Sequence, residues 1–467
     1  MVFMNWKEYF KFLENKKISW ILTVFLLLLI LFLGIQIRVS GLSNLVDPTT
    51  EDYTPLALDP YYFLRVSETL LENEGNLPAV DEMRYPALKP GWTNEILPQS
   101  TVIIYKIMKT FNPETSLRYA AVLNPVVFFA LGLIIFFFLV NLLVKNRAVA
   151  LSATFILSII PPYLYRTLAG FSDHESIGMF GFFLAMFMFF MGLFYLEKRK
   201  SSLKISLIFG FLAGIFTMFA ISAWGGGAKF LFMIFPVAFF ADWIIKKNYS
   251  SSKNYFSFYS LWILGILISA KFFGFGIFQV AKTYMLNSFG ILTFVVLMYL
   301  FFEMLNYRFK IIDDKYSKYH ELIIIGAIIL AGSVLYQLFI GSIFNLIYDL
   351  ILKIVSPFGT GRVGLTVAEN KQPYLNDLIS QVGKVFFYTF LVGCSFVGLK
   401  ISQGIKNKKL GALFFVSFSF FILGILFSRI SPESLFNGEN FISQAFVFIS
   451  FISFVIVSIY TYKTSSF

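Results

Sequence analysis

The chain has 467 residues, of which 58% are hydrophobic and 14% are charged. Soluble domains carry about 25% charged residues, so this composition excludes an ordinary soluble protein and predicts an all-α polytopic integral membrane protein. The formal net charge is +12. It does not indicate nucleic acid as a partner, because the lysines and arginines gather in short loops between apolar runs, as cytoplasmic loops do.

The first apolar run, at 18–37, follows Lys7, Lys11, Lys16 and Lys17. It is long enough to cross a bilayer, and we expect a retained anchor with a cytoplasmic N-terminus. The further runs raise the prediction to about twelve or thirteen transmembrane helices. They lie at 120–143, 148–166, 177–196, 203–222, 227–245, 256–278, 285–303, 322–346, 384–400, 409–428 and 441–461.

Basic clusters fall in alternate loops, which places the remaining loops together on the outer face of the cell membrane. These outer loops are predicted at 38–118, 166–176, 223–227, 347–383 and 429–440. The first is long and rich in proline, and the loop at 347–383 carries Gly359, Gly361 and Gly364, which predicts mobility. We expect residues 1–467 to form one transmembrane domain, with its functional residues on the outer side.

Asp59 opens the segment D-P-Y-Y-F-L-R in the first outer loop. One interpretation is a helix start, with Asp59 as the N-cap and Pro60 at the first helical position. The alternative is a functional carboxylate that holds a cation and polarises a substrate.

Asp173, His174 and Glu175 stand between two apolar runs in the segment R-T-L-A-G-F-S-D-H-E. Ser172 and Glu175 have the spacing of a capping box, which is the purely structural interpretation. The competing interpretation is a Mg²⁺ or Mn²⁺ site, because hard divalent ions prefer carboxylate oxygens. His174 is then either a ligand or a hydrogen-bonding neighbour of the two acids.

Three further outer segments carry candidate residues. Glu369 ends T-V-A-E in the loop 347–383, either as a solvated acid or as the catalytic acid of a lid. Trp224 belongs to A-W-G-G-G, which predicts the outer end of a helix. Arg429 is either a snorkelling residue or a phosphate ligand, since its planar fork of donors suits phosphate.

The order and type of these motifs resemble the catalytic subunit of oligosaccharyltransferase, the archaeal type in particular. This resemblance covers nearly the whole chain and implies a GT-C glycosyltransferase fold. It further implies metal-dependent, inverting transfer of a glycan from a polyprenyl (dolichol-type) phosphate or diphosphate to asparagine. The acceptor polypeptide carries the sequon Asn-X-Ser/Thr, and the lipid-linked oligosaccharide is the donor.

By motif match, the resemblance implies a role for each candidate. Asp59 and Glu369 are the catalytic acids and also metal ligands, and Asp173 and Glu175 complete the ligand set for Mg²⁺ or Mn²⁺. Arg429 faces the lipid phosphate. Arg166, which keeps the family spacing ahead of Asp173, and His174 and Trp224 are additional candidates without a defined role.

One feature departs from the family pattern. The family carries a C-terminal soluble domain with a W-W-D-Y-G motif, whereas none of the six tryptophans here adjoins another. We expect that domain to be absent from this sequence. The chain is then a truncated piece or a minimal relative, or a separate subunit supplies acceptor recognition.

Two other functions stay open from the sequence alone. Another GT-C transferase would use a polyprenyl-phosphate sugar with a lipid or hydroxyl acceptor. A non-enzymatic transporter would place charges inside several spans, whereas the distinctive acids here lie in predicted loops. Lys271, inside the run 256–278, is an exception.

Overall fold

The computed structural model describes residues 16–81, 83, 96–197, 202–246, 251–312, 319–355 and 373–464. The described residues form helices and two isolated β-bridges, with no β-strand among them. The chain divides into two compact units, Met1–Val334 and Leu335–Phe467. The prediction of an all-α membrane protein is therefore confirmed.

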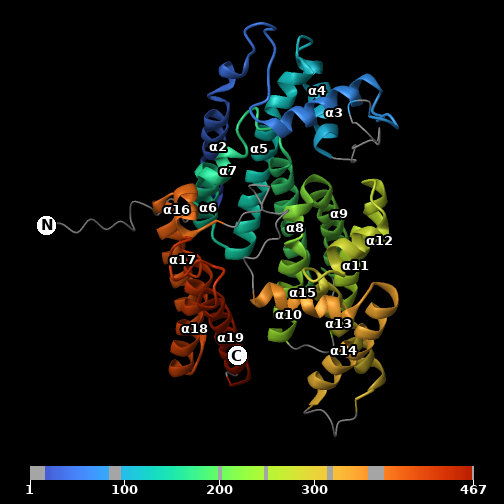
Figure 1. Cartoon of the computed structure of the whole chain (residues 1–467), viewed down its shortest axis with the longest axis vertical. Helices are drawn as coiled ribbons and strands as arrows, with labels where there is room; N and C mark the ends of the chain where they lie inside the picture. Colours follow the sequence, from blue (N-terminus) through green and yellow to red (C-terminus); the bar gives the residue numbers. More distant parts are fainter. Residues whose placement is uncertain are drawn as a thin grey trace, which may run out of the picture. The chain divides into compact units, whose positions relative to one another are not determined.

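The first unit holds the helices that carry the candidate site (Figure 1). They are α2 (Lys16–Val39), α3 (Leu58–Glu72), α4 (Ile96–Phe111), α5 (Leu117–Val144), α6 (Arg147–Ile159), α7 (Pro161–Tyr165), α8 (His174–Glu197), α9 (Leu203–Ala228), α10 (Leu231–Lys246), α11 (Ser252–Phe272), α12 (Ile277–Val280) and α13 (Ile291–Phe309), followed by α14 (His320–Phe339), which crosses the boundary between units. Helices α3 and α4 lie at one end of the bundle formed by α5, α8, α9 and α11 (Figure 1).

The second unit holds the shorter C-terminal part of the chain. Its helices are α15 (Ile343–Val355), α16 (Leu375–Val382), α17 (Lys384–Gly404), α18 (Lys408–Phe427) and α19 (Phe441–Thr464). Helix α18 packs between α17 and α19. Asn407 caps α18 by accepting the backbone N–H groups of Lys409 and Leu410, which satisfies two donors that a helix start leaves unpaired.

The core of the first unit is aromatic. Phe189 of α8 stacks on Phe235 of α10 with ring centroids 4.1 Å apart, and the fully buried Trp262 of α11 lies edge-on to both rings. The indole N–H of Trp262 donates to Thr217 Oγ1 of α9 at 3.1 Å. This satisfies the one polar group of the indole, as a low-dielectric environment demands.

Ten described helices are long and apolar enough to cross a membrane, which identifies a multi-pass membrane protein. Two of the twelve predicted spans correspond to shorter apolar helices, α6 and α10. The run at 148–166 is divided because Pro161 and Pro162 start the separate helix α7 and cannot continue the hydrogen bonding of α6. Lys271 lies in the last turn of α11, where a cation is favourable at the negative end of the helix dipole.

Candidate active site

The loop between α7 and α8 is fastened to two neighbouring elements. The Gly170 N–H donates to the Val122 carbonyl of α5 at 2.8 Å, and the Ser172 hydroxyl donates to the Ala121 carbonyl. On its other side, the Gly170 carbonyl accepts the N–H of Leu56, from the first predicted outer loop, at 2.9 Å. Because its backbone groups are paired on both sides, the loop holds the start of α8 in a defined position.

Asp173 immediately precedes α8 and is 4% exposed. Its Oδ1 accepts the backbone N–H of His174 at 2.7 Å and lies 2.7 Å from His174 Nδ1. Burial opposes ionisation, but the hydrogen bonds and charge of His174, with the charge of Arg166, outweigh it and lower the pKa of Asp173. The contacts with His174 and Arg166 therefore favour the charged form of this carboxylate.

Glu175 lies in the first turn of α8 and is partly buried. Its Oε1 is 3.0 Å from Arg166 Nη1, while its Oε2 is buried and accepts no hydrogen bond from the described residues. No capping box involving Ser172 and Glu175 is seen among the described hydrogen bonds, since Ser172 binds α5 instead.

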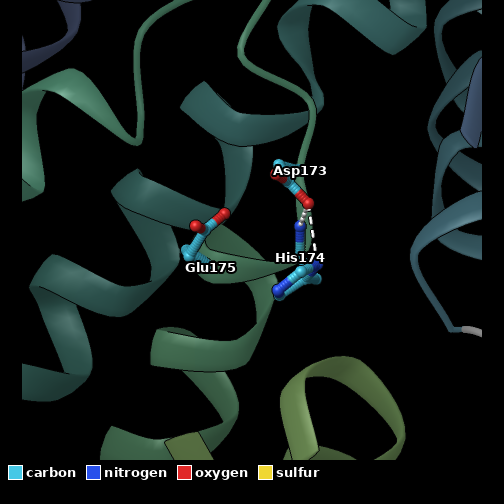
Figure 2. A group of neighbouring side chains, drawn as sticks. All are labelled: Asp173, His174 and Glu175. Atoms are coloured by element: carbon cyan, nitrogen blue, oxygen red, sulfur yellow. Dashed lines mark hydrogen bonds and ion pairs between the residues drawn. The ribbon is translucent and has the colours of Figure 1, made fainter. Parts of the chain in front are cut away.

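Asp173, His174 and Glu175 each place a potential ligand atom within 4.8 Å of the others (Figure 2). Figure 2 shows the imidazole of His174 paired with Asp173, and the carboxylate of Glu175 on the neighbouring side of the α8 start. Two carboxylates, one with a buried oxygen that lacks a partner among the described residues, fit a hard divalent cation. The predicted association of these acids is therefore present.

The imidazole of His174 lies between aromatic rings from two other helices. Its centroid is 6.2 Å from that of Phe63 of α3, edge-on, and 6.1 Å from that of Trp224 of α9. The backbone of α9 departs from helical geometry at Trp224 and then resumes, so A-W-G-G-G forms a kink rather than the predicted loop 223–227. Trp224 therefore helps to orient the histidine that pairs with Asp173.

Replacing Gly178 with alanine should displace Trp224. A Cβ at Gly178 of α8 would lie 2.4 Å from the Trp224 Cβ, closer than real contacts allow. We expect the free energy of unfolding to fall by about 1–3 kcal/mol, the usual cost of overpacking, and the activity to fall with it. Gly326→Ala in α14 is the matched control, because nothing lies within 4 Å of a Cβ there. Equal melting temperatures and activities for the two variants would contradict this packing.

Asp59 is exposed and lies at the second position of α3, one helical turn before Phe63. The predicted cap is wrong: Ala57 occupies the N-cap position and makes no side-chain hydrogen bond. A carboxylate in the first turn is still favourable because it faces the positive end of the helix dipole. Asp59 lies one turn before Phe63, which contacts His174, but it does not belong to the group of ligand atoms within 4.8 Å formed by Asp173, His174 and Glu175. Its association with these residues therefore stays a prediction.

Arg429 belongs to the second unit and is 6% exposed. Its guanidinium carbon lies 4.3 Å from the centroid of Tyr374, and its Nη1 lies 3.4 Å from Oε1 of the largely exposed Glu439. These contacts restrain the guanidinium, and the choice between snorkelling and phosphate binding stays a prediction. Glu369, in the predicted loop 347–383, lies outside the described residues.

The sequence did not single out Phe63 or Arg38. Phe63 could have been found from its place one turn after Asp59. Arg38 was assigned to the edge of the first outer loop, but it lies inside α2 and is 1% exposed. A single arginine at the end of an apolar run carries no signal that distinguishes burial from snorkelling.

The chain is similar in sequence and in fold to archaeal oligosaccharyltransferases. A curated dolichyl-phosphooligosaccharide-protein glycotransferase of Methanococcus voltae is 26% identical over 282 residues, covering 54% of this chain and 30% of that protein. The chain thus spans under a third of that relative's length. An archaeal oligosaccharyltransferase AglB of Archaeoglobus fulgidus, solved with an inhibitory peptide and dolichol-phosphate, superposes with a TM-score of 0.60 at 18% identity. That match covers 93% of this chain and 50% of the AglB chain.

A second Archaeoglobus fulgidus oligosaccharyltransferase structure, a complex with Zn and sulfate, matches with a TM-score of 0.53 at 16% identity. It covers 92% of this chain and 49% of that one. These likenesses show a shared fold. Residues 19–366, about three quarters of the chain, match the family described as "Oligosaccharyl transferase STT3, N-terminal". With most of its length inside that match, the chain belongs to the STT3 family of oligosaccharyltransferases.

Proposed function

We propose that the protein transfers a glycan from a polyprenyl (dolichol-type) phosphate or diphosphate to the side-chain amide of Asn in an Asn-X-Ser/Thr acceptor. The observation that carries this proposal is the Asp173–His174–Glu175 group at the start of α8, in which Asp173 is buried and the other two are partly buried. It is supported by the family match and by a solved relative that holds dolichol-phosphate and a peptide. The reaction takes place on the outer face of the membrane, and the N-terminus is cytoplasmic.

In this reaction the bond from the anomeric carbon to the phosphate oxygen breaks, and a bond to the amide nitrogen forms with inversion. The amide nitrogen is a poor nucleophile because its lone pair is delocalised into the carbonyl. Asp59 and Glu369 are proposed to accept hydrogen bonds from the amide NH₂ group, which turns the nitrogen out of conjugation. One amide proton leaves to a carboxylate acceptor as the new bond forms.

The leaving group is an anionic lipid phosphate, so cations near it lower the barrier. Asp59, Asp173, Glu175 and Glu369 are the proposed ligands of Mg²⁺ or Mn²⁺, and a bound ion of this kind would stabilise the charge on the leaving phosphate. Arg429 is proposed to donate charge-assisted hydrogen bonds to the same group. Arg166 pairs with Glu175 and keeps that carboxylate turned towards Asp173.

Removal of divalent ions should abolish transfer. A lipid-linked oligosaccharide and a sequon peptide are incubated with the full chain, with and without a chelator, and glycopeptide is measured by mass spectrometry. We expect product only without chelator, with recovery after Mn²⁺ or Mg²⁺ is added. A sequon peptide with Gln in place of Asn is the control. Undiminished transfer in chelator contradicts the metal assignment.

The same assay separates the alternatives. Product on a hydroxyl or a lipid, with none on Asn, would favour another GT-C transferase. Transport of a glycolipid by purified protein without any transfer would favour the transporter. The chain spans less than a third of a curated relative, so we repeat the assay with a native membrane extract. Activity that requires the extract supports a separate subunit for acceptor recognition.

A further inference from the structure

Arg38 is a buried cation in the last turn of α2. Its Nη1 donates to the carbonyls of Gly34 and Ser158, both at 3.0 Å, and its Nε donates to Thr167 Oγ1 at 2.7 Å. Its Nη2 has no hydrogen-bond partner, and no carboxylate forms an ion pair with it, among the described residues. Burial of an unpaired charge costs free energy that an apolar side chain would avoid, so stability alone does not account for an arginine here.

The guanidinium of Arg38 lies over an aromatic ring. Its carbon is 3.3 Å from the centroid of Phe129, a fully buried residue of α5. The approach depends on Gly34, since a Cβ at that position would come within 2.7 Å of the Phe129 ring. A desolvated cation–π contact of this kind stabilises the guanidinium in its position over Phe129.

The contacts of Arg38 connect it with the candidate site through Thr167. Thr167 adjoins Arg166, the residue that pairs with Glu175 at 3.0 Å. The backbone carbonyl of Arg38 also accepts the N–H of Ala169 at 3.1 Å. Arg38 therefore holds the loop that precedes Asp173 through two hydrogen bonds, one from its side chain and one from its backbone.

We infer that Arg38 is a positioning residue for the acidic group. It sets Thr167, and through it Arg166, so that the guanidinium of Arg166 meets Glu175. Arg38 itself touches neither substrate nor reacting atoms. The catalytic part of this inference rests on the proposed function, whereas the ordering of residues 166–173 does not.

The test compares Arg38→Met, Arg38→Lys and Thr167→Val in the full chain. Loss of a residue that orients a ligand commonly costs tenfold to a hundredfold, so we expect kcat to fall about tenfold in Arg38→Met, with KM for both substrates unchanged. Arg38→Lys keeps a donor within reach of Thr167 and should recover most of the loss. Thr167→Val removes the acceptor of the Arg38 Nε–H, together with the hydroxyl that donates to the Tyr163 carbonyl at 2.6 Å. Because the Arg38–Thr167 contact is already lost in either single variant, the double variant should lose less activity than the product of the two single losses.

Amide hydrogen exchange measures the ordering without any reaction. In Arg38→Met, the amides of Ala169 and Gly170 should exchange at least about tenfold faster than in the unmodified protein. Arg147→Met is the matched control. Arg147 begins α6, and its guanidinium carbon lies 4.7 Å from the ring centroid of Trp20 in α2. This contact joins the same two helices as the Arg38–Ser158 contact, but at their other ends. It should leave exchange of 166–173 and kcat unchanged.

Two outcomes overturn the inference. One is exchange of 166–173 in Arg38→Met that equals that of the unmodified protein. The other is an equal fall in kcat for Arg38→Met and Arg147→Met without recovery in Arg38→Lys, which would indicate general destabilisation. If the unmodified protein transfers no glycan with or without the membrane extract, while exchange responds as expected, the proposed function fails and the positioning role stands. If Arg38→Met does not fold, Thr167→Val alone decides both readouts.

Discussion

Asp173→Asn is expected to lower glycan transfer roughly a thousandfold, because the proposed cation loses a charged ligand and the leaving phosphate loses the stabilisation it depends on. Asparagine matches aspartate in size and can still accept the N–H of His174, as Asp173 does at 2.7 Å. The start of α8 should therefore remain intact, so a stability change does not explain the loss. The measurement is the initial rate as a function of Mn²⁺ concentration. The Mn²⁺ concentration that gives half of the maximal rate should be higher in Asp173→Asn.

The control for Asp173→Asn is Asp47→Asn. Asp47 lies in the first predicted outer loop, where its carboxylate accepts the N–H of Thr49 at 2.7 Å and the hydroxyl of Thr49 at 2.6 Å. It is an acid held by local hydrogen bonds outside the proposed ligand set, so its substitution should leave the rate unchanged. Full activity in Asp173→Asn, or equal losses in the two variants, would defeat the assignment of Asp173.

Asp59→Asn should give the second large effect, a fall in transfer of at least about a hundredfold, since a positioned acid–base group contributes about 10²–10⁴. The proposed role is to accept a hydrogen bond from the acceptor amide, which asparagine does less strongly because it carries no charge. We expect the loss in kcat rather than in KM for the peptide, because the interaction matters when the nitrogen attacks.

Glu369→Gln should resemble Asp59→Asn, and the double variant should fall far less than the product of the two losses, because the acids act on one NH₂ group. Glu68→Gln is the control on the same helix as Asp59. Glu68 lies on α3 and pairs with Arg118 at 3.4 Å, with 35% of its side chain exposed. Transfer that survives in Asp59→Asn, or strictly multiplicative losses in the double variant, would contradict the shared role.

Several features of the fold followed from the sequence because they depend on local composition. Apolar runs of sufficient length predict spans, and ten described helices meet that criterion. The span at 148–166 was wrong in extent because the prediction gave the paired prolines 161 and 162 too little weight. Trp224 was placed at a helix end, whereas α9 is only kinked there.

The proximity of Asp173 and Glu175 follows from the sequence alone, since residues two apart at a helix start cannot be far separated. The membrane-spanning character likewise follows from the sequence, because long apolar runs are buried in lipid whichever helices they pack against. Tertiary structure alone decided the environment of these acids: Phe63 and Trp224 against His174, and Arg38 beneath the preceding loop. These contacts join residues 129 positions apart in the case of Arg38 and Thr167. They arise from the packing of helices α2, α3, α5 and α9. Hydrophobic periodicity does not predict which residues of these helices face one another.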